Sequence, residues 1–187
     1  MNEIIENLLT RRSTRAYKDE QIKDSELDLI LEAAKFAPSG MNSQTWHFTV
    51  VQNKERLQEL NKVVKEALAN SPEENFRKIG NNPNFHFFYN APTFIIVSNA
   101  KNSPIAGPDS AVALQNIFLA AHSLEIGSCW IHMLVSVCNV PAVRSLLTEL
   151  GVPENNDVYG SAAIGYSAAE NAPKAPERKA GTVNIVK

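Results

Sequence analysis

The run Thr93-Phe94-Ile95-Ile96-Val97 decides the fold that this sequence predicts. It is a continuous apolar stretch of strand length, and its aromatic and β-branched side chains favour an extended backbone. A strand of this composition has no side that suits water. We therefore expect residues 93–97 to form a central strand that is buried on both faces.

Apolar patterns on either side of this run predict interspersed helices and strands. We expect three further strands, at His47 to Val51, around Cys129 to Met133 and at Val158 to Ile164. We also expect four helices: one that follows Asp24-Ser25 and ends at Pro38, one that carries Leu57 to Leu68, one from Asp109 to Leu124 and one from Pro141 to Leu150. The order is not strict βαβ alternation. The α+β class therefore fits better than a doubly wound nucleotide-binding fold.

The expected helix from Asp109 to Leu124 is apolar nearly all round. Pro108-Asp109-Ser110 is typical of a helix start, and Gly127 is typical of a helix stop. A helix of this kind has no polar face to turn toward solvent. It must be covered on most sides, either in the middle of a domain or against a partner subunit.

Two segments have only a weak pattern. Ser71 to Tyr89 is polar and rich in asparagine, which indicates a loop or lid with short helical pieces. The tail from Ala172 to Lys187 ends in Val183 to Val186, and this ending could add an edge strand to a neighbouring sheet.

Composition limits the class of protein. A chain of 187 residues lies below the roughly 250 at which single cores begin to split. The net charge of −2 argues against a nucleic-acid binder, and no run approaches the roughly 18 apolar residues of a membrane span. The N-terminus also lacks the layout of a secretory signal. We expect one cytoplasmic domain, with Cys129 and Cys138 as thiols in the core.

The stretch Arg11-Arg12-Ser13-Thr14-Arg15 brings three guanidinium groups and two hydroxyls together. A guanidinium binds phosphate through a planar fork of donors, and neighbouring hydroxyls add further donors. The stretch therefore suggests a phosphate clamp. On the residues alone, two other interpretations stay open: a solvated basic surface and a kinase substrate site.

The sequence lacks the motifs of a Rossmann dinucleotide site, a P-loop and a serine hydrolase. No GxGxxG follows a strand, and there is no GxxxxGK[ST] and no Gly-x-Ser-x-Gly elbow. The four histidines, His47, His86, His122 and His132, do not stand at metal-ligand spacing, so we expect no metal site. No residue set supports acid–base or covalent catalysis unaided, which suggests that the chemistry comes from a cofactor.

Four stretches carry a resemblance to a known family. They are Arg11 to Tyr17, Ala37 to Phe48, Asp109 to Asn116 and Ala163 to Tyr166. In this order they resemble the successive signatures of the FMN-dependent nitroreductase family. The resemblance implies a three-layer α-β-α sandwich with a central, mostly antiparallel sheet, built as a single domain of residues 1–187.

The resemblance also implies an intertwined homodimer with one FMN at each of two subunit interfaces. The helix from Asp109 to Leu124 would then pack against its counterpart across the dimer axis. The C-terminal tail, about residues 171–187, would extend onto the partner subunit.

The family pattern assigns residues of this chain to FMN. It puts Arg11, Arg12, Ser13 and Arg15 around the phosphate and the pyrimidine edge of the flavin. Arg178 in the tail would add a second phosphate contact.

Three further stretches match the family's flavin contacts. Pro38, Ser39 and Asn42 match a turn that lies beside the flavin from the partner chain. Asn84 is the nearest candidate for an asparagine that contacts the flavin ring. The segment Trp130-Ile131-His132-Met133 would run past the central ring with a backbone amide that points at N5.

The sequence departs from the family pattern at three places. Thr45 stands where proline is usual, Ser167 replaces the proline of the familiar Gly-Tyr-Pro, and His132-Met133 is not the pair expected beside the flavin. None of these changes removes a phosphate ligand. They leave the substrate and the redox tuning open, and His132 could either pack as a strand residue or face the flavin.

The expected activity is that of an FMN-dependent oxidoreductase. By a ping-pong mechanism, NADH or NADPH would give hydride to the flavin, and a small-molecule acceptor such as a nitroaromatic or a quinone would take the electrons. Other interpretations stay open: reductive dehalogenation, flavin fragmentation, a flavin-binding or storage module, and an anion-binding regulator without flavin.

Overall fold

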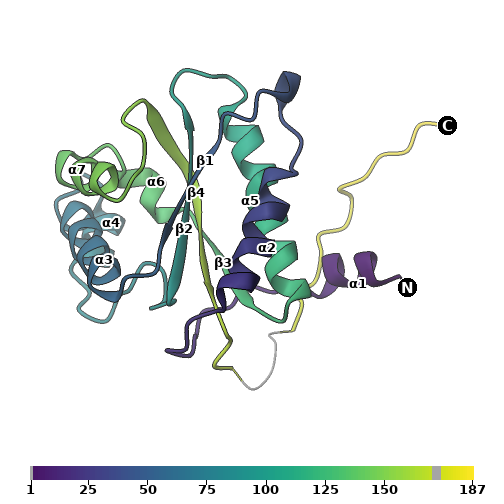
Figure 1. Ribbon diagram of the computed structural model, residues 1–187, viewed down its shortest axis with the longest axis horizontal. Helices are drawn as coiled ribbons and strands as arrows, with labels where there is room; N and C mark the ends of the chain where they lie inside the picture. The colour runs from purple at the N-terminus through teal and green to yellow at the C-terminus, as the bar shows by residue number, and fades with distance from the viewer. Residues whose placement is uncertain (1, 170–173) are drawn as a thin grey trace.

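The computed structural model describes residues 2–169 and 174–187, and its centre is a four-stranded antiparallel sheet (Figure 1). The strands are β1 (His47–Val51), β2 (Thr93–Ala100), β3 (Gly127–Ile131) and β4 (Asn156–Gly165). Their order across the sheet is β1-β2-β4-β3, and all neighbours run antiparallel. The expected α+β class with an antiparallel sheet is confirmed.

Strand β2 lies in the middle of the sheet and is buried from Thr93 to Asn99. Phe94 and Ile96 belong to one hydrophobic core, whereas Ile95 and Val97 belong to a second one. This division follows from the alternation of side chains along a strand. The prediction of a central strand buried on both faces is therefore confirmed.

Helices cover both faces of the sheet. They are α1 (Glu3–Thr10), α2 (Asp24–Lys35), α3 (Lys54–Ala69), α4 (Glu74–Gly80), α5 (Ala106–Ser123), α6 (Met133–Val137) and α7 (Pro141–Glu149), with a single turn of 3-10 helix, η1, at Gly40–Asn42. In Figure 1, α3, α4, α6 and α7 lie on one side, α2 and α5 lie on the other, and α1 projects beyond the end of α5. This arrangement is the expected three-layer sandwich.

The predicted ends of the long central helix were wrong. Helix α5 begins at Ala106, so Asp109 lies inside its first turn, where its carboxylate accepts a hydrogen bond from the backbone N–H of Gly40. At the other end, Glu125 takes the left-handed conformation (φ 59°) after the helix, and Gly127 already belongs to β3. Asp109, which the sequence indicated as part of a helix start, therefore anchors the distant turn that contains Gly40.

The structure also corrects the segment from Cys129 to Met133. The strand ends at Ile131, and Met133 is the first residue of α6. The five residues of α6 are too few to produce a helical pattern in the sequence. Helix α1, which the sequence analysis did not predict, has no buried residue.

One predicted helix start in the first half changed. Asp24 and Ser25 lie within α2, and the residue before the helix is Lys23, whose backbone N–H donates to the Glu26 carboxylate (2.9 Å). The polar segment before β2 contains the short helix α4, in agreement with the expected short helical pieces, and α4 packs along α3. Gly80 permits this contact, because a Cβ there would lie 2.3 Å from the backbone nitrogen of Ala69.

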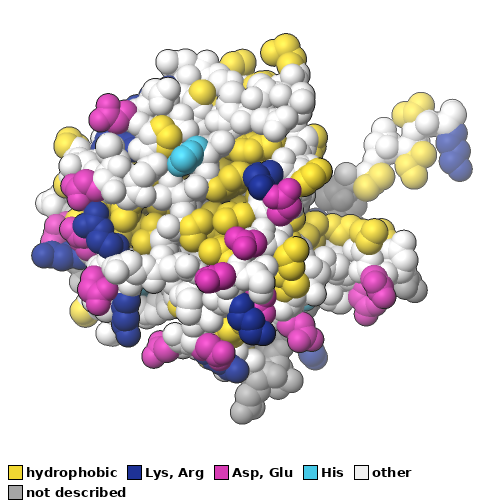
Figure 2. All heavy atoms as spheres, in the orientation of Figure 1, with side chains coloured by type: hydrophobic (Ala, Val, Ile, Leu, Met, Phe, Trp, Pro, Cys, Tyr) yellow, Lys and Arg dark blue, Asp and Glu magenta, His cyan; other side chains and the backbone are white. Residues whose placement is uncertain are grey.

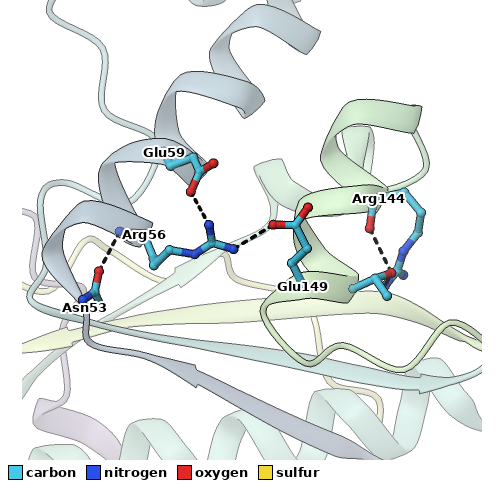
Figure 3. A network of polar contacts seen from close by, with 6 residues as sticks. Asn53, Arg56, Glu59, Arg144 and Glu149 are labelled. Carbon is cyan, nitrogen blue, oxygen red and sulfur yellow. Dashed lines mark hydrogen bonds and ion pairs between the residues drawn. The ribbon is translucent and has the colours of Figure 1, made fainter.

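A polar network joins α3 to α7 on the side of the sheet that they share (Figure 3). The Arg56 guanidinium donates to the carboxylates of Glu59 (2.6 Å) and Glu149 (3.1 Å), while the Asn53 side chain accepts the backbone N–H of Arg56 (2.9 Å). These bonds hold the first turn of α3 against α7. That turn forms one wall of the main cavity, described below.

Both cysteines lie in the core that α3 covers, as expected, and both are free thiols. Among the described residues, no helix has the length and apolar character needed to cross a bilayer.

Candidate functional site

The arginine-rich segment lies along the outer edge of β3. Ser13 pairs with Ser128 in a short parallel bridge, and the backbone N–H of Thr14 donates to the Ser128 carbonyl (2.9 Å). Gly127 allows this approach, because a Cβ there would lie 2.8 Å from the Thr14 hydroxyl oxygen. The sheet edge therefore fixes the backbone between the arginines.

Arg11 lies on the α5 side of this edge. Its guanidinium carbon stands 5.8 Å from the centre of the Phe118 ring, and the Trp130 ring lies 6.2 Å from the same ring. Burial and the neighbouring Arg12 lower the pKa of Arg11 below its usual value. Arg11, Phe118 and Trp130 thus form one cationic and aromatic group, in which Trp130 is 48% exposed.

Arg15 lies on the opposite side, with its guanidinium carbon 5.9 Å from the centre of the Tyr89 ring. A hydrogen bond to the Tyr89 side chain raises the pKa of Arg15. Arg12 turns back on its own backbone, where its guanidinium donates to the carbonyls of Leu9 (2.7 Å) and Arg11. The three guanidinium groups therefore point to three different places and do not converge in this protomer.

Helix α1 fixes the position of the Arg11 backbone, because Arg11 directly follows the helix. The Asn7 side chain donates to the Leu119 carbonyl (3.0 Å), and the Thr10 hydroxyl lies 3.0 Å from Nε2 of His122. Both contacts dock α1 on the last turns of α5. Arg12 completes the end of α1, because its guanidinium satisfies a carbonyl that the helix leaves without a partner.

The far end of β3 has an open edge. Ser128 bonds to the N-terminal segment, and side-to-side alternation along a strand directs the N–H and C=O of Trp130 toward the same edge. Ile131 is buried in the core, His132 is exposed and Met133 is half-buried at the start of α6. Of this segment, Trp130 and His132 are accessible, and His132 is not packed in the core.

The Cys129 thiol lies beneath the arginine segment. Burial raises its pKa, although Arg15, the Ser13 hydroxyl and Arg11 act in the opposite direction. Because burial is the larger effect, this sulfur stays a protonated core group. Its surroundings do not resemble the exposed, electropositive setting of a nucleophilic cysteine.

The turn that contains Pro38, Ser39 and Asn42 is built by its own polar groups. The Ser39 hydroxyl accepts the backbone N–H of Gln44 (3.1 Å), and the Gln44 side chain donates to the Asn42 side chain (2.9 Å). Met41, Asn42 and Gln44 all have positive φ, and Met41 is 95% exposed. Asp109 anchors the turn through Gly40.

This turn and the arginine segment contact α5 at different levels. The turn is bound at Asp109, whereas Arg11 lies over Phe118, nine residues further along the helix. Nine residues correspond to about 14 Å of helix. The two predicted parts of the site are therefore separated within one protomer.

The loop before β2 contains Asn84 and a strained turn. Asn84 is exposed, and its backbone N–H donates to the Asn82 side chain (3.0 Å). Tyr89 and Asn90 both have positive φ (59° and 56°), which is costly for residues other than glycine. Nδ1 of His86 accepts the Asn90 N–H (3.1 Å), and burial with nearby Lys65 lowers the pKa of His86 to about 4.

A cavity of about 690 Å³ opens beside Arg15. Its walls come from three segments: residues 15–21, the start of α3 and the loop of residues 86–92. The sequence did not predict this cavity or the contact of Arg15 with Tyr89. One feature of the sequence could have indicated the turn beside this cavity: Tyr89-Asn90 stands directly before Ala91-Pro92, which is a turn-forming sequence just before a strand.

The tail leaves the rest of the protomer. Residues 171–173 of the expected tail lie outside the described residues. From 174 to 187 the backbone is extended and exposed, and it runs away from the layered body (Figure 1). Arg178 is therefore exposed, and its guanidinium does not join the other arginines within the described part of this protomer.

Comparison with known proteins decides the family. Residues 8–166 match the sequence model of the Nitroreductase family. The chain belongs to the nitroreductase family. A relative from Archaeoglobus fulgidus, named for NADH dehydrogenase and NAD(P)H nitroreductase, is 32% identical over 176 residues, which are 91% of this chain and 88% of that protein.

Two solved nitroreductase structures share the fold. The nitroreductase from Bacteroides fragilis, crystallised with bound FMN, is 48% identical, with a TM-score of 0.97 and full coverage of both chains. The nitroreductase from Desulfitobacterium hafniense, also with bound FMN, is 30% identical, with a TM-score of 0.86 and full coverage of both chains. The three-layer sandwich is thus the nitroreductase fold.

The Asp109 carboxylate should hold the exposed turn in place. We expect Asp109→Ala to lower the free energy of unfolding by about 1.5–3 kcal/mol, because a buried charged acceptor of the Gly40 N–H is lost. Asp109→Asn should lose less, since it keeps an acceptor. Urea unfolding measures the stability, and hydrogen exchange of the Gly40 amide reports the turn. Asp28→Ala, an exposed change, is the control, and equal stability of Asp109→Ala and the parent would contradict the anchor.

Proposed function

We propose that this chain is an FMN-dependent oxidoreductase that takes electrons from NAD(P)H. The observation that carries the proposal is the open edge of β3, where Arg11 and Arg15 stand on either side of the Ser13–Ser128 bridge and next to exposed Trp130. The names of the relatives, which include FMN and NAD(P)H, support it.

The chemistry of this edge fits a flavin mononucleotide. Within residues 2–169 and 174–187, neither Arg11 nor Arg15 forms an ion pair, so both cations are available to an anion. The edge of β3 adds backbone donors and acceptors, and Trp130 adds an apolar surface. FMN needs these three things: a cation for its phosphate, polar groups for its pyrimidine and an apolar wall for its rings.

In this proposal Arg11 and Ser13 bind the phosphate, together with Arg178, and Arg15 lies at the pyrimidine edge. Arg12 acts indirectly, because its guanidinium already holds the end of α1. The backbone from Trp130 to Met133 supplies polar groups to the ring system. When bound, FMN supplies reversible hydride transfer, so a nicotinamide and an acceptor can use one site in turn.

We also propose that residues 1–187 form one domain that works as a homodimer. Ser39 and Asn42 of one subunit would complete the site of the other, since they are far from the arginines of their own chain. The apolar side chains that this pairing would bury are exposed on α1, on α2, directly after α2 and on α5. They are Ile4, Leu8, Leu9, Leu29, Phe36 and Val112.

The tail has a matching place on a second copy. The outer edge of β1 is free of backbone partners in the described protomer, whereas the edge of β3 already carries Ser13. Figure 2 shows apolar side chains in the hollow between the helical layers, along the line of β1. We propose that Val183 to Val186 adds a strand to β1 of the partner, which also brings Arg178 across the interface.

The electron acceptor in this proposal is a small planar molecule such as a nitroaromatic or a quinone. The segment before β2 packs on α3, where Lys65 donates to the carbonyls of Asn82 (2.7 Å) and Pro83 (3.2 Å). A segment held in this way favours an open site rather than a clamp on one substrate. Because NAD(P)H is supplied inside cells, the proposal places the enzyme in the cytoplasm.

Reduction and reoxidation of the bound flavin test the activity. We expect the purified protein to be yellow, NADH or NADPH to bleach it without oxygen, and a nitroaromatic or quinone to restore the colour in a second step. Stopped-flow absorbance measures each half-reaction alone, which also tests the ping-pong order. A colourless protein that takes up no FMN would exclude the proposal.

The arginines should control retention of FMN. We expect Arg11→Ala with Arg178→Ala to weaken FMN binding by roughly tenfold or more for each lost contact, because charge-assisted hydrogen bonds contribute about 1.5–3 kcal/mol. Fluorescence titration of FMN measures the affinity. Arg56→Ala is the control, since Arg56 pairs with Glu59 and Glu149 (Figure 3) and is not among the residues proposed for FMN. Equal affinity of the double variant and the parent would refute the phosphate contacts.

The tail should hold the dimer together. Deletion of residues 181–187 removes Val183 to Val186 and leaves Arg178 in place. We expect the dissociation constant of the dimer to rise above that of the parent, because a strand and its apolar side chains are lost. Sedimentation velocity measures this constant. Val183→Ser with Val186→Ser tests the same contact without shortening the chain. An unchanged dissociation constant in both variants would mean that the tail does not bridge the subunits.

A further inference from the structure

The cavity beside Arg15 is not explained by the residues proposed for FMN. Its volume is about 690 Å³, and of its lining residues only Arg15 belongs to the FMN set. The rest of the cavity extends from Arg15 along the N-terminal segment to the first turn of α3. It therefore adjoins the proposed flavin site and has a wall of its own.

The floor of the cavity is apolar and contains aromatic rings. Leu57, Phe88 and Ala91 are almost fully buried, with 5%, 1% and 1% of their surface exposed. Tyr17 and Tyr89 stand at its sides, and the Tyr17 hydroxyl is already occupied, 2.8 Å from the Thr14 carbonyl. A surface of this kind suits a flat aromatic ring.

The rim of the cavity carries more positive than negative charge. Arg15 and Lys54 are its cations, and Asp19 is its carboxylate. Within the described parts of the chain, neither cation forms an ion pair. Gln58 lies one turn after Lys54 on the same helix and is exposed. The rim therefore attracts an anion over the apolar floor.

The turn at the mouth of the cavity is held in a costly conformation. Two consecutive residues, Tyr89 and Asn90, are left-handed, and the neutral His86 ring accepts the Asn90 N–H. Since Nδ1 is the acceptor, the ring carries its proton on Nε2 and remains a donor. Strain of this kind is typical of binding sites, where it aims side chains at a ligand.

We propose that this cavity binds a small aromatic molecule that carries a carboxylate, with the ring on Phe88 and the carboxylate between Lys54 and Arg15. In identifying that molecule as the electron acceptor, the inference rests on the proposed function. The binding itself does not, because the cavity and its charges belong to this chain alone. Lys54 then selects anionic aromatic ligands over neutral ones.

Calorimetric titration of the purified protein, with and without added FMN, with 4-nitrobenzoate and with 4-nitrobenzamide tests the proposal. The two probes have the same ring and nitro group and differ in charge. We expect the parent to bind the acid roughly three- to tenfold more tightly than the amide, the range of one accessible ion pair with added hydrogen bonds. Lys54→Gln should reduce this preference by removing one of the two cations, and Gln58→Glu should reduce it by placing a negative charge at the rim.

Lys62→Gln is the matched control, because Lys62 is exposed on α3 outside the cavity. It should keep the preference of the parent. Equal binding of acid and amide by the parent, or an unchanged preference in both Lys54→Gln and Gln58→Glu, would overturn the proposal. The titration needs no turnover, so failure of the proposed oxidoreductase activity would leave its result readable.

A nucleotide phosphate could supply the same negative charge, and adenosine 2′-monophosphate is the probe that distinguishes it. If Lys54→Gln weakens binding of this nucleotide and leaves 4-nitrobenzoate unaffected, the cavity serves a nucleotide and the aromatic carboxylate is excluded. We expect the opposite pattern.

Discussion

The short parallel bridge between Ser13 and Ser128 is the contact on which the candidate site depends. It occupies one end of an edge strand and leaves the other end open. It also fixes the chain between Arg11 and Arg15, so that one cation lies over Phe118 on the α5 side and the other over Tyr89 on the opposite side. Gly127 makes this bridge possible, because any side chain there would collide with Thr14.

A second constraint is the length of α5. The helix holds the turn of Gly40 near its start and Arg11 over its second half, so one protomer cannot bring the two together. A rigid helix keeps such distances, since each residue adds about 1.5 Å. In the proposed homodimer, a second copy of the chain would resolve this separation. The exposed apolar side chains of α1 and the extended tail are consistent with such a partner.

Most of the regular structure could be predicted from the sequence, and the reasons for the failures are physical. The strand at residues 93–97 and the helix of Leu57 to Leu68 bury large apolar surfaces, which leave a clear periodic pattern. Helix α6 is too short for such a pattern, and α1 is held by Asn7 and by contacts to α5. Asp109 resembled a helix cap, but its carboxylate accepts a hydrogen bond from the backbone N–H of the distant residue Gly40.

The sequence by itself determined the buried central strand, the two faces that helices must cover, and the ordered motifs that resemble nitroreductases. The tertiary structure alone decided how the motif residues are used. Arg12, which the sequence could not distinguish from Arg11 and Arg15, donates to its own helix end. The cavity beside Arg15 likewise exists only after folding, because its walls come from three segments that are far apart in the chain and meet through packing. Local patterns record burial and turns, whereas convergence of polar groups depends on contacts between distant residues.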